Sequence, residues 1–175
     1  MRGPPSMIAD ARHPPSMTGD AREPKPLEFR PWRERDLDAV CEIERRTFPL
    51  PWTREQFRDL LAHPAGLGWI AAPADSRVVG YAVGWVAADE AELADLAVAE
   101  EQRNGGIGAL LVRAFAREAG VRGARRLYLE VRVSNEGAQR FYERLGFGVV
   151  GRRRAYYRNP NEDGLAMAAD LPLIA

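Results

Sequence analysis

A glycine-rich loop is the first segment of this sequence whose residue types could bind a ligand. It reads Arg103-Asn104-Gly105-Gly106-Ile107-Gly108. Glycines let the backbone approach a ligand closely, and the free N–H groups at the start of a following helix attract phosphate. The arginine at the head of the loop adds a cation beside that phosphate. From these residues alone, a phosphate site and a plain tight turn between a strand and a helix both stay open.

Two common phosphate motifs do not fit this loop. No Lys-Ser or Lys-Thr pair follows the glycines, as a nucleotide P-loop requires, and Leu111 stands where a dinucleotide fingerprint has its third glycine. The sequence therefore excludes both motifs.

A carboxylate and a phenol downstream of the loop could exchange protons with a substrate. Glu130 lies in an expected strand, 126–133, on the face opposite the aliphatic residues, so it can point into a cleft and accept a proton. Tyr142 follows on an expected helix, and a phenol of pKa about 10 suits the protonation of a thiolate whose thiol has a pKa of about 8.5. Structural explanations stay open for both: Glu130 as the ion-pair partner of Arg132 or another arginine, and Tyr142 as part of the core.

The composition is that of a globular domain. The 175 residues are 46% hydrophobic and 29% charged, which suffices for one domain with a substantial core but not for two. The single cysteine, Cys41, excludes an internal disulfide or a Cys-rich zinc site, and with only two histidines no metal site is expected. The longest nearly apolar run, 80–88, is too short to cross a membrane, and no signal peptide is recognisable, so we expect a cytoplasmic protein without a membrane partner.

The net charge of zero hides two opposite segments. The 25 Lys and Arg residues balance the 25 Asp and Glu residues, which argues against a nucleic-acid partner. However, residues 78–102 carry a net charge of −6 and residues 103–158 one of +9. The basic half begins at the arginine of the loop and suits a ligand with several phosphates, whereas the acidic stretch suits a cationic peptide end.

The pattern of the chain predicts one folded domain after a leader. Residues 1–26 hold six of the thirteen prolines and little that could pack, so we expect an unfolded leader and a domain over 27–175. Expected strands are 27–30, 69–72, 77–86, 91–98, 126–133, 147–151 and 165–170. Helices are expected from the N-caps Asp36, Thr53 and Asn135 and from the glycine loop, with Gly120 and Gly146 as stops. This predicts an α/β (mixed α+β) fold, a mixed sheet of about six to seven strands covered by about four helices.

Several of these segments resemble one enzyme family. The glycine loop fits the acyl-CoA signature R/Q-x-x-G-x-G/A of the GNAT acetyltransferase superfamily. Residues 129–147 resemble the block L-E-V-R-x-S-N-x-x-A-x-x-x-Y-x-x-x-G-F of RimI-type N-terminal acetyltransferases. Further matches are Ile43-Glu44, Phe48-Pro49, Pro51-Trp52, Asp89-Glu90, Arg154-x-Tyr156-Tyr157 and Glu162-Asp163 with Met167. The resemblance spans residues 29–170, with one departure at Ala99-Glu100, where the family often has Asp-Pro.

The resemblance implies a GNAT fold with acetyl-CoA as cosubstrate and no metal. In the family, the loop binds the pyrophosphate of coenzyme A, and the pantetheine arm lies in a gap where the central twisted sheet splays. The cofactor-binding residues carried over are Leu96, Ala97, Val98, Arg103, Asn104, Gly105, Gly106, Ile107, Gly108 and Asn135. Backbone N–H groups near Ala97 and Val98 would polarise the thioester, and Asn135 would both cap its helix and contact the cofactor.

The resemblance also implies a reaction. Glu130 stands at the position of the family's proton acceptor and Tyr142 at that of its proton donor, for direct attack by an amine within a ternary complex. With no His beside it in the sequence, Cys41 is a poor candidate for an acyl intermediate and is expected in the core. The implied acceptor is a protein N-terminus, specifically the N-terminal alanine of the eighteenth small-subunit ribosomal protein. Weaker candidates for its pocket are Glu44, Trp52, Glu90 and Tyr157.

Two alternatives stay open at this point. One is a GNAT enzyme that acts on another amine, such as lysine, other N-termini or a small molecule. The other is an inactive acyl-CoA-binding module. The sequence leaves the oligomeric state open, and a monomer is compatible with it.

Overall fold

The computed structural model describes residues 26–74, 77–158 and 160–173, so the expected leader lies almost wholly outside the described residues. Seven strands form one sheet in the order β1-β2-β3-β4-β5-β7-β6. β4 and β5 run parallel, and all other neighbours are antiparallel. The strands are β1 Leu27–Pro31, β2 Gly66–Pro73, β3 Gly80–Ala87, β4 Glu90–Val98, β5 Arg126–Arg132, β6 Gly148–Arg158 and β7 Asn161–Asp170. The expected mixed sheet of an α/β fold is confirmed.

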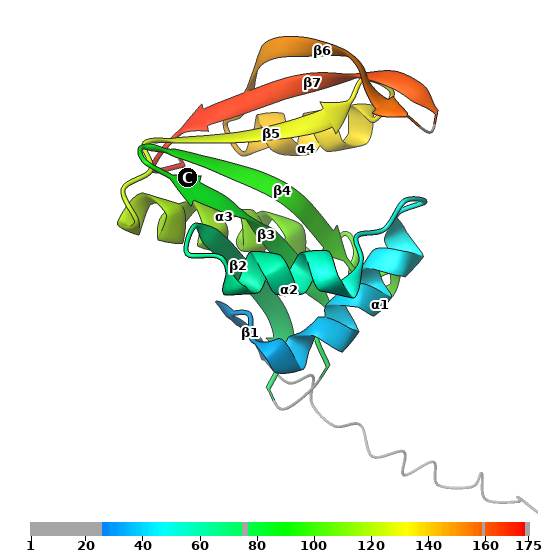
Figure 1. Cartoon of the computed structure of the whole chain (residues 1–175), viewed down its shortest axis with the longest axis vertical. Helices are drawn as coiled ribbons and strands as arrows, with labels where there is room; N and C mark the ends of the chain where they lie inside the picture. The colour runs from blue at the N-terminus through cyan, green and yellow to red at the C-terminus, as the bar shows by residue number, and fades with distance from the viewer. Residues whose placement is uncertain (1–25, 75–76, 159, 174–175) are drawn as a thin grey trace, which may run out of the picture.

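Helices cover both faces of this sheet (Figure 1). They are α1 Leu37–Thr47, α2 Arg54–Ala62, α3 Ile107–Val121 and α4 Glu136–Arg144, with short 3-10 turns η1 Glu34–Asp36 and η2 Glu100–Gln102. On one face α1 and α2 close a core that contains Leu37, Phe57 and Tyr81. On the other face α3 closes a second core around Phe115 and Leu127, against which α4 also packs. The sheet therefore separates two hydrophobic cores, and burial of both holds it rigid.

β4 changes direction at a β-bulge opposite Gly84. The register between β3 and β4 shifts between Val83 and Gly84 and leaves Ala94 without a partner of its own. A Cβ at Gly84 would lie 1.8 Å from the backbone oxygen of Glu92, so only glycine fits at this approach. The bulge bends β4 just where its pairing with β5 ends.

β4 and β5 part beyond the bulge. Their ladder pairs Glu90–Glu92 with Arg126–Tyr128 and extends no further along either strand. Figure 1 shows the two strands diverging toward their C-terminal ends, with β5, β7, β6 and α4 on one side of the gap and β1 to β4 on the other. The expected splay of the sheet is confirmed.

Three local expectations need correction. The side chain of Asp36 does not cap α1, because its carboxylate binds Arg30 at 2.7 and 2.8 Å and accepts the N–H of Arg33. α3 continues through Gly120, and the chain turns at Gly123, whose φ of +101° is left-handed. β6 and β7 extend well beyond 147–151 and 165–170, because exposed arginines and tyrosines continue β6 at the solvated edge of the sheet.

Other local expectations are confirmed. Thr53 Oγ1 accepts the N–H of Gln56 at 3.2 Å, and Gly146 follows α4 with a φ of +93°. Cys41 is buried in the core that α1 covers. Within the part of the chain that the structure describes, no helix is long and apolar enough to cross a membrane.

Replacing Gly84 by alanine should destabilise the fold, because the new Cβ overlaps the Glu92 carbonyl. We expect the free energy of unfolding, measured by urea denaturation, to fall by about 1–3 kcal/mol. Gly148→Ala is the matched control, since a Cβ at this glycine of β6 meets no atom within 4 Å. Equal stability of the two variants would contradict the role assigned to Gly84.

Candidate active site

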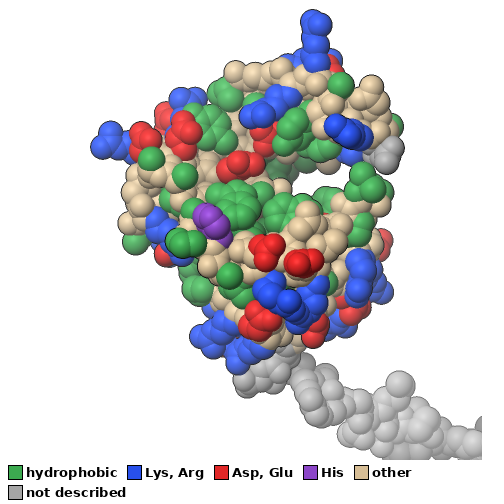
Figure 2. Space-filling view, in the orientation of Figure 1, with side chains coloured by type: hydrophobic (Ala, Val, Ile, Leu, Met, Phe, Trp, Pro, Cys, Tyr) green, Lys and Arg blue, Asp and Glu red, His purple; other side chains and the backbone are tan. Residues whose placement is uncertain are grey.

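A cavity of about 570 Å³ lies where β4 and β5 part. Its walls come from both parted strands, from β6 and α4, and from the segment between α1 and α2. Figure 2 shows the molecule open at this place, between the part that carries β5 to β7 and the rest. The expected site residues that line the cavity are Glu44, Trp52, Leu96, Glu130, Asn135, Tyr142 and Tyr157. The opening of the sheet thus brings together side chains from four stretches of the chain, 44–52, 93–96, 129–142 and 156–158.

Glu130 reaches this cavity from β5, and its side chain is 13% exposed. It alternates with the buried Leu129 and Val131, as expected for a strand with one apolar face. Its Oε1 lies 3.1 Å from Nε of Arg153 on β6. The structural alternative of an ion pair is therefore confirmed, although Arg132 pairs with Glu162 instead. An ion pair with a largely exposed arginine is weak enough to exchange with another cation, so it is compatible with a proton acceptor.

Tyr142 lines the cavity from α4. Its ring packs edge-on against Phe141 and Phe147, with centroids 5.0 and 5.6 Å apart. Burial, and next the charge of Asp95, raises the pKa of Tyr142 above its ordinary value of 10. The phenol therefore stays protonated at neutral pH and is available as a hydrogen donor. The alternative that Tyr142 is a core residue is correct in part, because its side chain packs against the core that α3 closes. The same residue also faces the cavity.

The glycine loop turns sharply before α3. Asn104 and Gly106 have φ angles of +65° and +79°, and a Cβ at Gly106 would meet no atom within 4 Å. Leu110 makes the first helical hydrogen bond, to the Gly106 carbonyl, so the N–H groups before it are not used within the helix. Turned backbone at a helix start attracts anions. The Nε of Arg103 donates to the Val98 carbonyl at 3.0 Å and fastens the loop to the end of β4.

The last residues of β4 offer a backbone edge to the gap. Leu96, Ala97 and Val98 pair with β3 on one side and have no strand on the side of β5. Asn135 faces the same cavity and caps α4 by accepting the N–H of Ala138 at 3.0 Å, which confirms its structural role. A ligand with amide or carbonyl groups finds backbone partners along this edge.

The four weaker candidates lie in two places. Trp52 and Tyr157 line the main cavity from different elements, and burial raises the pKa of Tyr157 to about 12. The Arg132 guanidinium lies 4.1 Å from the ring centroid of Tyr157. Glu44 lies deeper in the wall, and Glu90 lines a neighbouring cavity of about 400 Å³ that shares Glu130.

Glu44 and Tyr81, both buried, form a trio with the half-buried Asp95. One oxygen of Glu44 accepts the N–H of Trp52 at 2.7 Å, which holds the segment between α1 and α2. The Tyr81 hydroxyl contacts the other oxygen of Glu44 and lies 3.0 Å from Oδ2 of Asp95. A hydroxyl has a single hydrogen to donate, so the two contacts together require a proton on one carboxyl. Burial, and next the charge of Glu44, raises the pKa of Asp95 to about 8, so Asp95 holds that proton at neutral pH.

Sequence reasoning missed Asp95, Tyr81 and Arg153 as residues of this region. The signal for Asp95 was a charge in the otherwise apolar second half of β4. Tyr81 is the polar tip within an apolar run, and Arg153 belongs to an arginine triplet before a tyrosine pair. None of these signals predicts which residue the side chain contacts, because each contacted residue is distant in the sequence.

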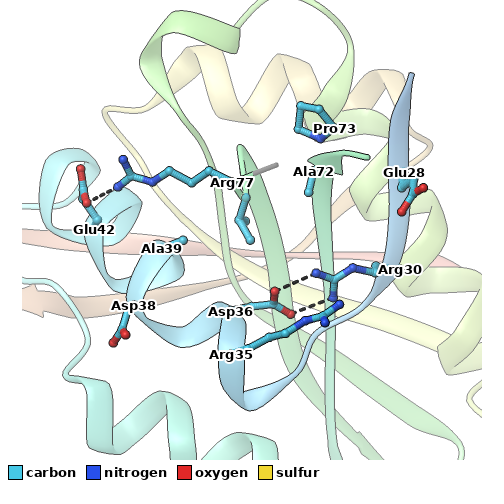
Figure 3. Close-up of a pocket in the computed structure, with 11 residues that line it drawn as sticks. Glu28, Arg30, Arg35, Asp36, Asp38, Ala39, Glu42, Ala72, Pro73 and Arg77 are labelled. Carbon is cyan, nitrogen blue, oxygen red and sulfur yellow. Dashed lines mark hydrogen bonds and ion pairs between the residues drawn. The ribbon is translucent and has the colours of Figure 1, made fainter. Parts of the chain in front are cut away.

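A further cavity of about 560 Å³ lies between β1 and α1 (Figure 3). Arg30 binds Asp36 across it, and Arg77 pairs with Glu42. These charges neutralise each other in pairs, and none of the expected site residues lines this cavity. The cavity at the parted strands is therefore the candidate active site.

Comparison with known protein families decides the class of this site. The model of the acetyltransferase (GNAT) family matches residues 37–147, which is more than half of the chain. This chain belongs to the GNAT family of acetyltransferases. The matched span contains the glycine loop, Glu130 and Tyr142, so the GNAT resemblance of the sequence is confirmed.

Relatives of this GNAT acetyltransferase are themselves N-acetyltransferases. A Bacillus subtilis (strain 168) protein, provisionally named a ribosomal protein bS18-alanine N-acetyltransferase, is 37% identical over 139 residues, 79% of this chain and 91% of its own length. The Salmonella typhimurium ribosomal protein bS18-alanine N-acetyltransferase is 34% identical over 142 residues, 79% of this chain and 93% of its own. The crystal structure of the Escherichia coli ribosomal-protein-S18-alanine N-acetyltransferase superposes with a TM-score of 0.76 at 30% identity, covering 85% of this chain and 96% of that chain.

The buried proton of Asp95 predicts a stability that depends on pH. An unfolded aspartate ionises near pH 4, whereas folded Asp95 ionises at about 8, so the folded state holds one more proton between these values. This stabilisation is full below pH 4 and is lost as the pH rises through 8. Compared with Asp95→Asn, the wild-type free energy of unfolding should fall by up to about 1 kcal/mol per pH unit from pH 5 to 8.

Urea denaturation of both proteins at pH 5, 6.5 and 8 measures this difference. Asp38→Asn is the matched control, because Asp38 is an exposed carboxylate of α1. A constant difference between wild type and Asp95→Asn across the three pH values would show that Asp95 does not hold the proton.

Proposed function

We propose that this acetyltransferase transfers the acetyl group of acetyl-CoA to a protein N-terminal α-amine, specifically the N-terminal alanine of ribosomal protein bS18. The observation that carries the proposal is that Glu130 and Tyr142 line one cavity beside the unpaired end of β4. This arrangement provides a proton acceptor, a proton donor and backbone dipoles around a single gap. The names of the relatives that the chain matches over most of their length support the choice of acceptor.

The residues present fit acetyl-CoA along the gap. The turned backbone of Asn104 and Gly106 and the start of α3 would bind the pyrophosphate, with Gly105, Ile107 and Gly108 completing the loop. Arg103, which already braces this loop against Val98, adds positive charge beside it. The edge of Leu96, Ala97 and Val98 would hold the extended arm by backbone hydrogen bonds. Asn135 lines the cavity from the opposite wall. Bound acetyl-CoA supplies the activated acetyl thioester.

Proton transfers in the proposed reaction balance between two residues. The neutral amine attacks the thioester carbonyl carbon, a C–N bond forms, and backbone N–H groups near Ala97 and Val98 stabilise the oxyanion. The C–S bond then breaks. Glu130 takes the proton that the new amide nitrogen loses, and Tyr142 gives its hydroxyl proton to the departing thiolate. Exchange of protons with solvent restores both residues.

The acceptor would enter on the side of Trp52 and Tyr157. Phe48, Pro49 and Leu50 continue this wall from the segment that Glu44 holds in place. An N-terminal α-amine has a reference pKa of about 7.7–8.0, against about 10.4 for lysine, so far less assistance is needed to make it neutral. An enzyme with this acceptor would work in the cytoplasm, where ribosomal proteins are made.

A peptide panel should separate this function from that of a lysine acetyltransferase. At pH 7.5 an α-amine offers about 300-fold more neutral nucleophile than lysine, so we expect a peptide with a free N-terminal alanine to be acetylated. The same peptide with a blocked N-terminus and an internal lysine should give less than a hundredth of that rate. Product masses identify the modified amine. Turnover of the lysine peptide alone would exclude the proposed acceptor, and turnover of neither, with acetyl-CoA bound, would indicate an inactive acyl-CoA-binding module.

Substitution of the two proton-transfer residues tests their roles. Glu130→Gln and Tyr142→Phe should each lower kcat by about 10²-fold or more, since general acid–base catalysis contributes about 10²–10⁴. Acetyl-CoA affinity, measured by calorimetry, should stay within a factor of two. Glu136→Gln is the control, because Glu136 is an exposed carboxylate of α4 outside the cavity. Wild-type kcat in both test variants would refute the assigned roles.

A further inference from the structure

Glu130 shares its surroundings with a second carboxylate, Glu92 on β4. Both line the neighbouring cavity of about 400 Å³, and Arg153 lines it as well. Burial, and next the charge of Glu130, raises the pKa of Glu92 above its ordinary value, while Arg153 lowers it. Glu92 is exposed and Glu130 is half-buried. Two carboxylates that line one cavity influence each other's ionisation, and a cation in contact with one of them favours charge on that one.

Arg153 contacts one member of this pair. Its Nε lies 3.1 Å from Oε1 of Glu130, and no salt bridge between Arg153 and Glu92 is found among the described residues. Glu130 is also the more enclosed partner, since its side chain is 13% exposed against 59% for Arg153. The guanidinium therefore stabilises the charged form of Glu130 by direct contact, whereas no such contact offsets the raised pKa of Glu92. Tyr156 and Tyr157 of β6 also face Glu130, and burial raises the pKa of both. The other titratable groups that share a cavity with Glu130 are Glu90, Tyr128, Glu44, Asp95, Arg132, Tyr142 and Arg158.

The β6 backbone is irregular next to Arg153. The pairing of β6 with β7 is interrupted between Arg153 and Tyr157, and Ala155 within the interruption has a φ of +48°. The Arg153 guanidinium also lies 5.6 Å from the ring centroid of Tyr156, which offers a second contact away from Glu130. An exposed ion pair of this kind exchanges readily with another cation.

We propose that Arg153 is a positioning residue for Glu130, whose guanidinium keeps Glu130 the ionised member of the Glu92–Glu130 pair until the acceptor amine replaces it. The inference rests on the proposed function, because it takes Glu130 as the proton acceptor. The acceptor displaces the guanidinium as an ammonium, which first gives one proton to solvent. The neutral amine then attacks the thioester, the N–H bond that the new amide nitrogen loses breaks, and an O–H bond forms on Glu130. Arg153 itself contacts neither the acetyl group nor the amine in this step.

Rates at two pH values test this role. At pH 8 the rate of Arg153→Gln should be more than a third of the wild-type rate. At pH 6 the ratio of the variant rate to the wild-type rate should be at least threefold lower than at pH 8, because without the cation Glu130 shares a proton with Glu92. The same peptide is used in every assay, so the ionisation of its amine affects both rates equally and cancels in the ratio of the variant rate to the wild-type rate. Arg153→Lys should restore most of the ratio at pH 6. Arg154→Gln, a substitution of the neighbouring exposed arginine, should give a ratio that does not change with pH.

A carboxyl ¹³C NMR titration of the full-length enzyme separates this inference from the proposed function. Signals of Glu92 and Glu130 are assigned with Glu92→Gln and Glu130→Gln, and the Glu130 midpoint should rise in Arg153→Gln, because loss of the cation favours the neutral carboxyl. An unchanged midpoint together with a pH-independent rate ratio overturns the role of Arg153. A raised midpoint in an enzyme whose Glu130→Gln variant keeps full activity supports the counter-ion role and overturns Glu130 as the base.

Discussion

The site of this acetyltransferase depends on a sheet that opens at one point. At Gly84 the backbone of the neighbouring strand lies so close that no side chain fits, and the accompanying bulge redirects β4 away from β5. A fully paired sheet would satisfy these backbone groups internally and leave no space between its strands. Past the bulge, the edge from Leu96 to Val98 is available to an extended ligand with amide groups, in the manner of an added strand.

The opening concentrates acidic groups, and three of them lie against a partner. Glu44 and Asp95 both contact the Tyr81 hydroxyl, with Asp95 protonated at neutral pH, and Glu130 lies against Arg153. A buried charge without a partner would destabilise the folded protein far more than these paired or neutral groups do. Tyr142, kept neutral by burial, lines the same cavity as Glu130.

Local signals in the sequence predicted most of the helices and strands. They did not predict contacts between strands that are distant in the sequence. The cap of Asn135, the alternation around Glu130 and the glycines before α3 are each encoded within one turn or strand, and the structure confirms them. The pairing of Glu130 with Arg153 depends on β6 lying at the edge of the order β5-β7-β6, which no local pattern displays. The prediction of Asp36 as a cap was wrong for the same reason, because its carboxylate accepts hydrogen bonds from Arg30 on β1.

Intact mass spectrometry of ribosomal proteins, from cells with and without this enzyme, tests the proposed acetyl transfer most directly. With the enzyme present, ribosomal protein bS18 should carry one acetyl group, and fragmentation should place it on the α-nitrogen of the N-terminal alanine. Without the enzyme, that acetyl group should be absent and the masses of the other ribosomal proteins unchanged. Equal acetylation of this N-terminus in both sets of cells would contradict the proposed acceptor.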